Sequence, residues 1–207
     1  MADIEPSVMR HVIAALVTNE PGVLAQVAGM FAARGFNIDS LVVGRTENPE
    51  LSRMTIVVHG DDRILEQIRK QLQRLVPVVK VVSYQDVAFV ERDLMLVQVA
   101  SSQGGSRNQT TSRRTEIIEL VNLFRARVVD VSRDGLMIEL SGTEEKIEAF
   151  IAMVEPYGVI ELARTGVIAM PRGSGGGGGA SAMQTRRRKP AAEKRKPNVD
   201  PKKLPPG

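Results

Sequence analysis

The stretch from His11 to His59 constrains the fold most, because its apolar residues change from strand spacing to helix spacing and back. After an apolar run at 11–17 and a short loop, apolar residues recur at helical spacing: Val23, Leu24, Val27, Met30 and Phe31. Gly35 ends this predicted helix, since glycine adopts the left-handed turn that closes many helices. Two further strands are predicted at 36–45 and 52–59, on either side of the turn at 47–50.

The residues that follow complete a first unit of the order βαββαβ. Asp61 and Asp62 open a second predicted helix, where acidic side chains suit the positive end of the helix dipole. Pro77 stops this helix, and 78–90 is predicted as the fourth strand. The predicted inward face of the helix carries Ile64, Leu65, Ile68, Leu72 and Leu75.

A second unit repeats the same order. Its first strand, 94–100, leads through the polar loop 101–114 into a helix that carries Ile117, Leu120, Val121 and Phe124. Strands at 128–131 and 136–140 flank a turn at Arg133-Asp134-Gly135. Thr143 then begins the last helix as an N-cap, and 159–170 is the predicted closing strand.

This element order predicts an α+β protein with two tandem ferredoxin-like βαββαβ domains. The predicted boundaries are an N-terminal extension at 1–9, a first domain at 10–91, a second domain at 92–172 and a tail at 173–207. The tail holds a five-glycine run and few apolar residues, so it is predicted to be disordered. It also carries nine basic and two acidic residues, a charge of +7 that leaves −3 on residues 1–172.

The composition excludes several classes of function. The chain has no Cys, which rules out disulfides, thiolate catalysis and Cys-based metal sites. His11 and His59 have no evident acid or nucleophile partner, and no acid–base constellation stands out, so neither a catalytic residue nor a metal site is predicted. No apolar run is long enough to span a membrane, and the first ten residues resemble no secretory or transit signal, so a cytoplasmic location is expected.

The loop before the first helix has the chemistry of a small anion site. The first N–H groups of a helix lack intrahelical acceptors and carry a partial positive charge, which suits a carboxylate. Asn19 and Gly22 stand where that helix begins. The alternative interpretation is structural, with Asn19 capping a turn and Gly22 serving only the loop.

Residues 18–41, followed by 48–58, closely resemble the ACT domain of the acetolactate synthase (acetohydroxyacid synthase) small regulatory subunit. The most specific parts are the segment from Arg34 to Leu41 and the segment from Leu51 to Ile56. In the second unit the resemblance rests on three segments: 115–117, 127–131 and 161–166. It covers roughly residues 10–172 and says nothing about the tail.

The resemblance implies a regulatory subunit that binds and activates the catalytic subunit of acetolactate synthase and confers feedback inhibition by a branched-chain amino acid. Thiamine diphosphate, Mg and FAD are expected only in that partner, with no cofactor in this chain. The resemblance also implies a homodimer of paired ACT domains, with the effector between the first loop of one chain and the second strand of its neighbour. The residues implied in effector binding are Asn19, Gly22, Val23, Leu24, Asn37 and Ile38.

The effector chemistry fits these residues. Backbone N–H groups from Gly22 to Leu24 can hold a carboxylate, and the Asn37 amide can bind an ammonium and a carboxylate. Leu24 and Ile38 can line an apolar pocket, but such a pocket separates neighbours that differ by one methylene by only about 1–3 kcal/mol. The resemblance makes valine the preferred effector, but because this discrimination is weak, leucine and isoleucine stay open. Modulation by a nucleotide and the stoichiometry of the complex stay open as well.

Two other functions compete with this prediction. RNA-recognition domains share the βαββαβ order, but they stack bases on aromatic residues of the central strands, and the strands at 11–17 and 52–59 have none. Nucleic-acid binding is therefore not expected of the folded units, and no membrane partner is expected. The second alternative is a stand-alone tandem ACT amino-acid sensor with a different partner.

Overall fold

The computed structural model describes residues 9–85, 87–101 and 107–173, and the backbone alone for 107–110. The first unit is a four-stranded antiparallel sheet in the order β2-β3-β1-β4. Its strands are β1 (Met9–Thr18), β2 (Ser40–Arg45), β3 (Leu51–Gly60) and β4 (Val78–Ser83). Helices α1 (Val23–Ala32) and α2 (Asp62–Arg74) pack on one face. The predicted tail lies outside the described residues except for Gly173.

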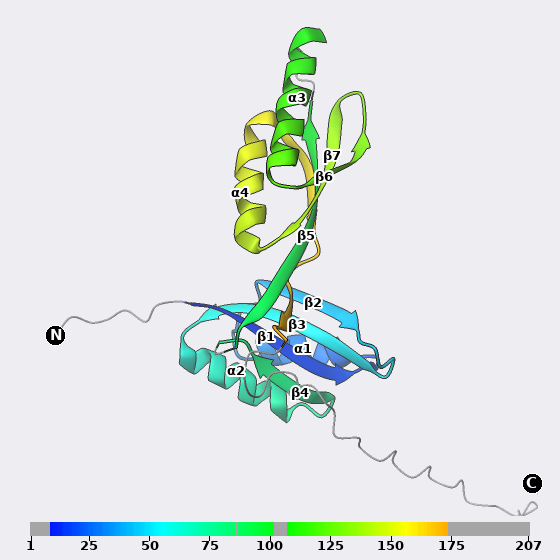
Figure 1. Ribbon diagram of the computed structural model, residues 1–207. Coiled ribbons are helices and arrows are strands. Elements are labelled where there is room, and N and C mark those ends of the chain that lie inside the picture. The colour runs from blue at the N-terminus through cyan, green and yellow to red at the C-terminus, as the bar shows by residue number, and fades with distance from the viewer. Residues whose placement is uncertain (1–8, 86, 102–106, 174–207) are drawn as a thin grey trace, which may run out of the picture.

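The second unit repeats this architecture around the strand order β6-β7-β5-β8. Its strands are β5 (Phe89–Ala100), β6 (Arg127–Val131), β7 (Gly135–Gly142) and β8 (Val159–Arg164). Its helices are α3 (Arg107–Leu123) and α4 (Glu144–Val154), followed by a short 3₁₀ helix, η1 (Glu155–Tyr157). Both helices lie on the same face of the sheet (Figure 1). The prediction of two tandem ferredoxin-like α+β units is confirmed.

The last strand, β9 (Ile168–Pro171), joins the two units. It returns from the second unit and pairs with the first part of β5, from Phe89 to Arg92. The remainder of β5 pairs with β7 and β8, so this one strand serves both units (Figure 1). The domain boundary predicted between residues 91 and 92 falls inside β5.

Three buried clusters hold the fold together. In the first unit, alternate β1 residues such as Ile13 and Ala15 pack against α1 and α2. The residues between them, Val12 and Ala14, face the opposite side and pack with residues of β9 and the chain before it. The strand β1 is therefore buried on both faces, which explains its nearly continuous apolar sequence. The second unit has its own core beneath α3 and α4.

The predicted starts of α2 and α4 agree with the structure. Asp61 caps α2, its Oδ1 accepting from the Ile64 N–H at 2.8 Å. Thr143 caps α4 in the same way, accepting from the Lys146 N–H at 3.4 Å. Gly35 adopts a φ of +67° shortly after α1 ends, which is the left-handed conformation expected of it.

Four predicted boundaries were wrong, three of them beside a contact that the spacing of apolar residues does not reveal. The strand predicted at 36–45 begins only at Ser40, since Asn37 bonds to Asp39 just before it. The strand predicted at 78–90 ends at Ser83, after which buried Tyr84 packs among Val12, Ala14 and their neighbours.

The other two corrections lie in the second unit. The closing strand predicted at 159–170 divides into β8 and β9, because Asp93 binds the intervening Thr165 and Gly166. The polar loop predicted at 101–114 becomes helical from Arg107, where Arg and Gln are good helix formers.

Candidate functional site

The N-terminus of α1 carries the partial positive charge of a helix end, and no acidic side chain lies in the first turn of this helix. Helices α2 and α4 have capping side chains and carry Asp or Glu in their first turns, whereas α1 has neither. Gly22 occupies the N-cap position with a φ of +84°, and a Cβ built there meets nothing within 4 Å. There is thus room for a small anion beside Gly22, although the Val23 N–H already donates to the Glu20 carbonyl at 3.5 Å.

Asn19 fastens this loop to the turn between β2 and β3. Its side-chain nitrogen donates to the Pro49 carbonyl at 3.0 Å, and its Oδ1 accepts from the Ser52 hydroxyl at 3.1 Å. Its backbone N–H donates to the Glu50 carbonyl at 2.8 Å. These bonds give Asn19 a structural role in shaping the loop.

Of the two residues after Gly22, Val23 is buried and Leu24 is exposed. The Val23 side chain is only 4% exposed and belongs to the core of the first unit. Val23 can therefore offer a ligand only its backbone. Leu24 is 46% exposed, so it presents an apolar side chain beside the helix terminus.

Asn37 and Ile38 lie just before β2. Asn37 is exposed, and its side-chain nitrogen donates to Asp39 Oδ1 at 2.9 Å. The other Asp39 oxygen, Oδ2, lies within hydrogen-bond distance of His59 Nδ1, at 2.7 Å. Ile38 is half-buried against the core of the first unit.

The expectation that His59 has no acid partner was wrong, whereas the His11 contact is with a backbone carbonyl, as in a satisfied histidine. His59 pairs with Asp39, and His11 Nε2 contacts the Gly60 carbonyl at 3.1 Å. The register of β2 against β3 brings His59 to Asp39 across 20 residues of chain. Sequence spacing gave no signal of this pair, because a strand register depends on the whole hairpin.

The six predicted residues form two groups at opposite ends of the first unit. Asn19 lies at the end of β1, whose Thr18 pairs with Leu51. Asn37 and Ile38 lie at the start of β2, whose Ser40 pairs with Val57. The strand from Leu51 to Val57 is about 20 Å long at 3.4 Å per residue. One chain therefore does not bring the two groups together.

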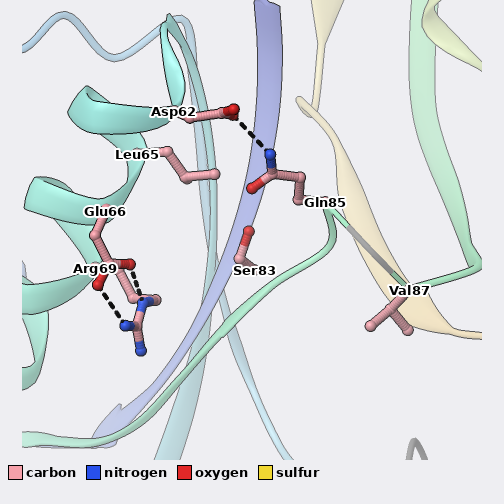
Figure 2. A pocket seen from close by; sticks show the side chains of 7 residues that line it. All are labelled: Asp62, Leu65, Glu66, Arg69, Ser83, Gln85 and Val87. Carbon is pink, nitrogen blue, oxygen red and sulfur yellow. Dashed lines mark hydrogen bonds and ion pairs between the residues drawn. The ribbon is translucent and has the colours of Figure 1, made fainter.

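A separate pocket lies between α2 and the chain that follows β4 (Figure 2). It is lined by Asp62, Leu65, Glu66, Arg69, Ser83, Gln85 and Val87. Its charged groups are already engaged: Gln85 donates to Asp62 at 2.6 Å, and Arg69 donates to both oxygens of Glu66. The hydrogen bond from Arg69, with help from Lys70, lowers the pKa of Glu66 to about 2. None of the six predicted residues lines this pocket.

Across the described ranges, no three His, Asp or Glu side chains gather closely enough to hold a metal ion. Within those same ranges, no helix is long and apolar enough to cross a membrane.

Both units match families of known proteins. Residues 13–80 match the model of the AHAS small subunit-like ACT domain, and residues 92–173 match that of the small subunit of acetolactate synthase. A probable acetolactate synthase small subunit of Archaeoglobus fulgidus is 53% identical over 166 residues, covering 80% of this chain and 99% of that protein. The acetolactate synthase small subunit of Mycolicibacterium smegmatis is 48% identical over 163 residues, covering 79% and 91%.

A crystal structure shows the same likeness in three dimensions. The acetolactate synthase small subunit of Thermotoga maritima superposes with a TM-score of 0.69 at 44% sequence identity. The match covers 79% of this chain and 98% of that chain. The similarity therefore spans both units and their order.

Proposed function

Since this chain belongs to the family of acetolactate synthase small subunits, we propose that it binds and activates the catalytic subunit of that enzyme and confers feedback inhibition by a branched-chain amino acid. Valine is the preferred effector. In this proposal the chain has no catalytic residue of its own, and thiamine diphosphate, Mg and FAD belong to the catalytic partner.

The observation that carries the proposal is the separation of the two groups of site residues. The N-terminus of α1 and the segment Asn37–Ile38 lie at opposite ends of the first unit, and β2 is an edge strand. A second copy related by a twofold axis, with its β2 alongside, brings the α1 terminus of one protomer toward Asn37 of its partner. An edge strand supports such pairing because its outer N–H and C=O groups have no ladder partner within the sheet.

The proposed site supplies one group for each part of the amino acid. The backbone N–H groups at the start of α1 receive the carboxylate. The Asn37 nitrogen is engaged by Asp39, so its carbonyl oxygen is the atom offered to the ammonium. Leu24 and Ile38 contact the branched side chain, and Asn19 holds the loop in place through Pro49.

Replacement of Gly22 tests this site, because its position tolerates the space of a side chain. Gly22→Asp places a carboxylate where the effector carboxylate binds, and two like charges at 4 Å repel by about 1–4 kcal/mol in water and near a protein surface. Valine affinity, measured by isothermal titration calorimetry, is expected to fall at least tenfold, which corresponds to about 1.4 kcal/mol.

Gly22→Asn is the matched control. It has the same shape as Asp, it tolerates a positive φ and it adds no charge. Its valine affinity is expected to lie between those of the wild-type chain and Gly22→Asp. Equal affinities for the two variants would contradict the carboxylate assignment. An absence of binding by wild-type chain, with valine, leucine or isoleucine, would favour a stand-alone tandem ACT sensor for another ligand.

A further inference from the structure

A buried carboxylate stands at the joint between the two units. Asp93, 2% exposed, lies in β5 where its pairing passes from β9 to β7 and β8. It accepts from Arg164 Nε at 2.8 Å, from the Thr165 hydroxyl at 3.2 Å and from the Gly166 N–H at 3.1 Å. The turn between β8 and β9 is thus fixed to the centre of β5.

The turn between β8 and β9 also contacts β2. The Val167 N–H donates to the Ser40 hydroxyl at 3.2 Å. A Cβ on Gly166 would lie 2.6 Å from Ser40 Oγ and 2.9 Å from Val42 Cγ2, and Gly166 has a φ of +84°. Both the space and the backbone conformation require glycine at this position.

The chain on either side of the turn is also held firmly. Ala169 is 2% exposed, and its carbonyl accepts from Arg53 at 2.7 Å and from the Tyr84 hydroxyl at 3.2 Å. On the other side, Arg164 donates to Glu148 on α4. A displacement of the turn therefore moves groups in both units.

These contacts form a continuous path from the proposed effector site to the second unit. Asn37 and Ile38 directly precede β2, whose first residue is Ser40. Ser40 contacts the turn, the turn is bound to Asp93, and Arg164 reaches α4. The space between Gly166 and β2 is too small for even a Cβ, so the turn and the start of β2 lie close together at this point.

We propose that the contact of Ser40 with Gly166 and Val167 couples effector binding at β2 to the position of the second unit. This inference rests on the proposed function, since it names how occupancy of that same site is transmitted. Ser40 and Asp93 are positioning residues in this scheme and do not touch the effector.

The coupling has a measurable signature. Effector and catalytic subunit influence each other only through different affinities for two arrangements of the chain. By linkage, the factor by which the catalytic subunit changes valine affinity equals the factor by which valine changes affinity for the catalytic subunit. The ratio of the valine Kd with and without the catalytic subunit therefore measures the coupling directly.

The test uses the full chain, its catalytic subunit and Ser40→Ala, which removes the acceptor of the Val167 N–H. The valine Kd of the free variant is expected to stay within about twofold of wild type. The ratio of its valine Kd with and without the catalytic subunit is expected to lie about fivefold closer to one than the wild-type ratio. A fivefold change corresponds to the net contribution of one neutral hydrogen bond. Ser83→Ala, at the opposite edge of the same sheet, is the matched control and is expected to keep the wild-type ratio.

A second variant and a second readout guard against a purely structural effect. Val42→Ala loosens the same contact without touching a hydrogen bond and is expected to lower the coupling in the same direction. Hydrogen exchange of the peptide 159–171 is expected to change when valine binds the wild-type chain, and not when it binds Ser40→Ala.

The outcomes separate this inference from the function on which it rests. Valine binding and coupling that are unchanged in Ser40→Ala and Val42→Ala would overturn the coupling role and leave the regulatory function intact. A wild-type chain that binds no branched-chain amino acid, or whose Kd ratio equals one, would overturn the proposed feedback function itself.

Discussion

Replacement of Gly166 by Ala tests how tightly the turn between β8 and β9 is packed. A left-handed conformation costs a residue with a Cβ about 1–2 kcal/mol relative to glycine. The new Cβ also lies 2.6 Å from Ser40 Oγ and 2.9 Å from Val42 Cγ2, and overpacking of this kind costs about 1–3 kcal/mol. The free energy of unfolding is therefore expected to fall by about 2–5 kcal/mol.

Gly35→Ala provides the control for the conformational part of this cost. Gly35 has a φ of +67°, and a Cβ built there meets nothing within 4 Å. Its replacement is expected to cost only the conformational part, about 1–2 kcal/mol. The difference between the two variants isolates the contact with β2.

The assay is urea unfolding followed by far-ultraviolet circular dichroism, because the chain has no tryptophan to report by fluorescence. Adding Ser40→Gly to Gly166→Ala is expected to recover part of the contact cost, since it removes the nearest atom. A loss of stability no larger for Gly166→Ala than for Gly35→Ala would refute the close packing of the turn on β2.

Three further predictions concern other parts of the structure. Asp93→Asn is expected to destabilise the chain by about 1–3 kcal/mol in urea unfolding, because it removes the charge-assisted hydrogen bond from Arg164, which keeps its ion pair with Glu148; a loss below about 1 kcal/mol would contradict this. Asp61→Ala is expected to cost about 1 kcal/mol in the same assay through loss of the α2 cap, whereas an unchanged midpoint would count against the cap. The pKa of Glu66 is about 2 instead of 4.5, so this group contributes stability that is present above pH 4.5 and is lost as the pH falls through about 2. Arg69→Ala is expected to raise this pKa, as measured by NMR titration of the carboxyl group, and an unchanged pKa would refute Arg69 as the cause.

Local sequence signals predicted the elements well where the causes are themselves local. The caps at Asp61 and Thr143 act within three residues, and the glycine after α1 acts within one turn. The cores followed from the same reasoning, since helical spacing identified Val27, Phe31 and their neighbours before any packing was visible.

The features that sequence reasoning missed depend on contacts between distant residues. Nothing in the spacing of 159–170 marks the break at Gly166, because Asp93 creates it from 73 residues away. The pairing of His59 with Asp39 depends on strand register, and the return of β9 to the first unit depends on a strand shared by both.

The candidate site also combines features that the sequence predicts with features that depend on contacts between distant residues. Its residues followed from the resemblance to a family, and the effector-binding role of Gly22, where a built Cβ meets nothing within 4 Å, stays a prediction. Their separation to opposite ends of one unit could not be predicted from spacing alone, because it depends on how β2 and β3 pair. That separation is the reason a second copy of the chain is needed in the proposed site.

The most direct test of the central claim is turnover of pyruvate to acetolactate by the cognate catalytic subunit, with and without this chain, across a valine titration. The chain is expected to raise turnover, and valine is then expected to inhibit only the complex. Turnover and valine response that are the same with and without the chain would contradict it.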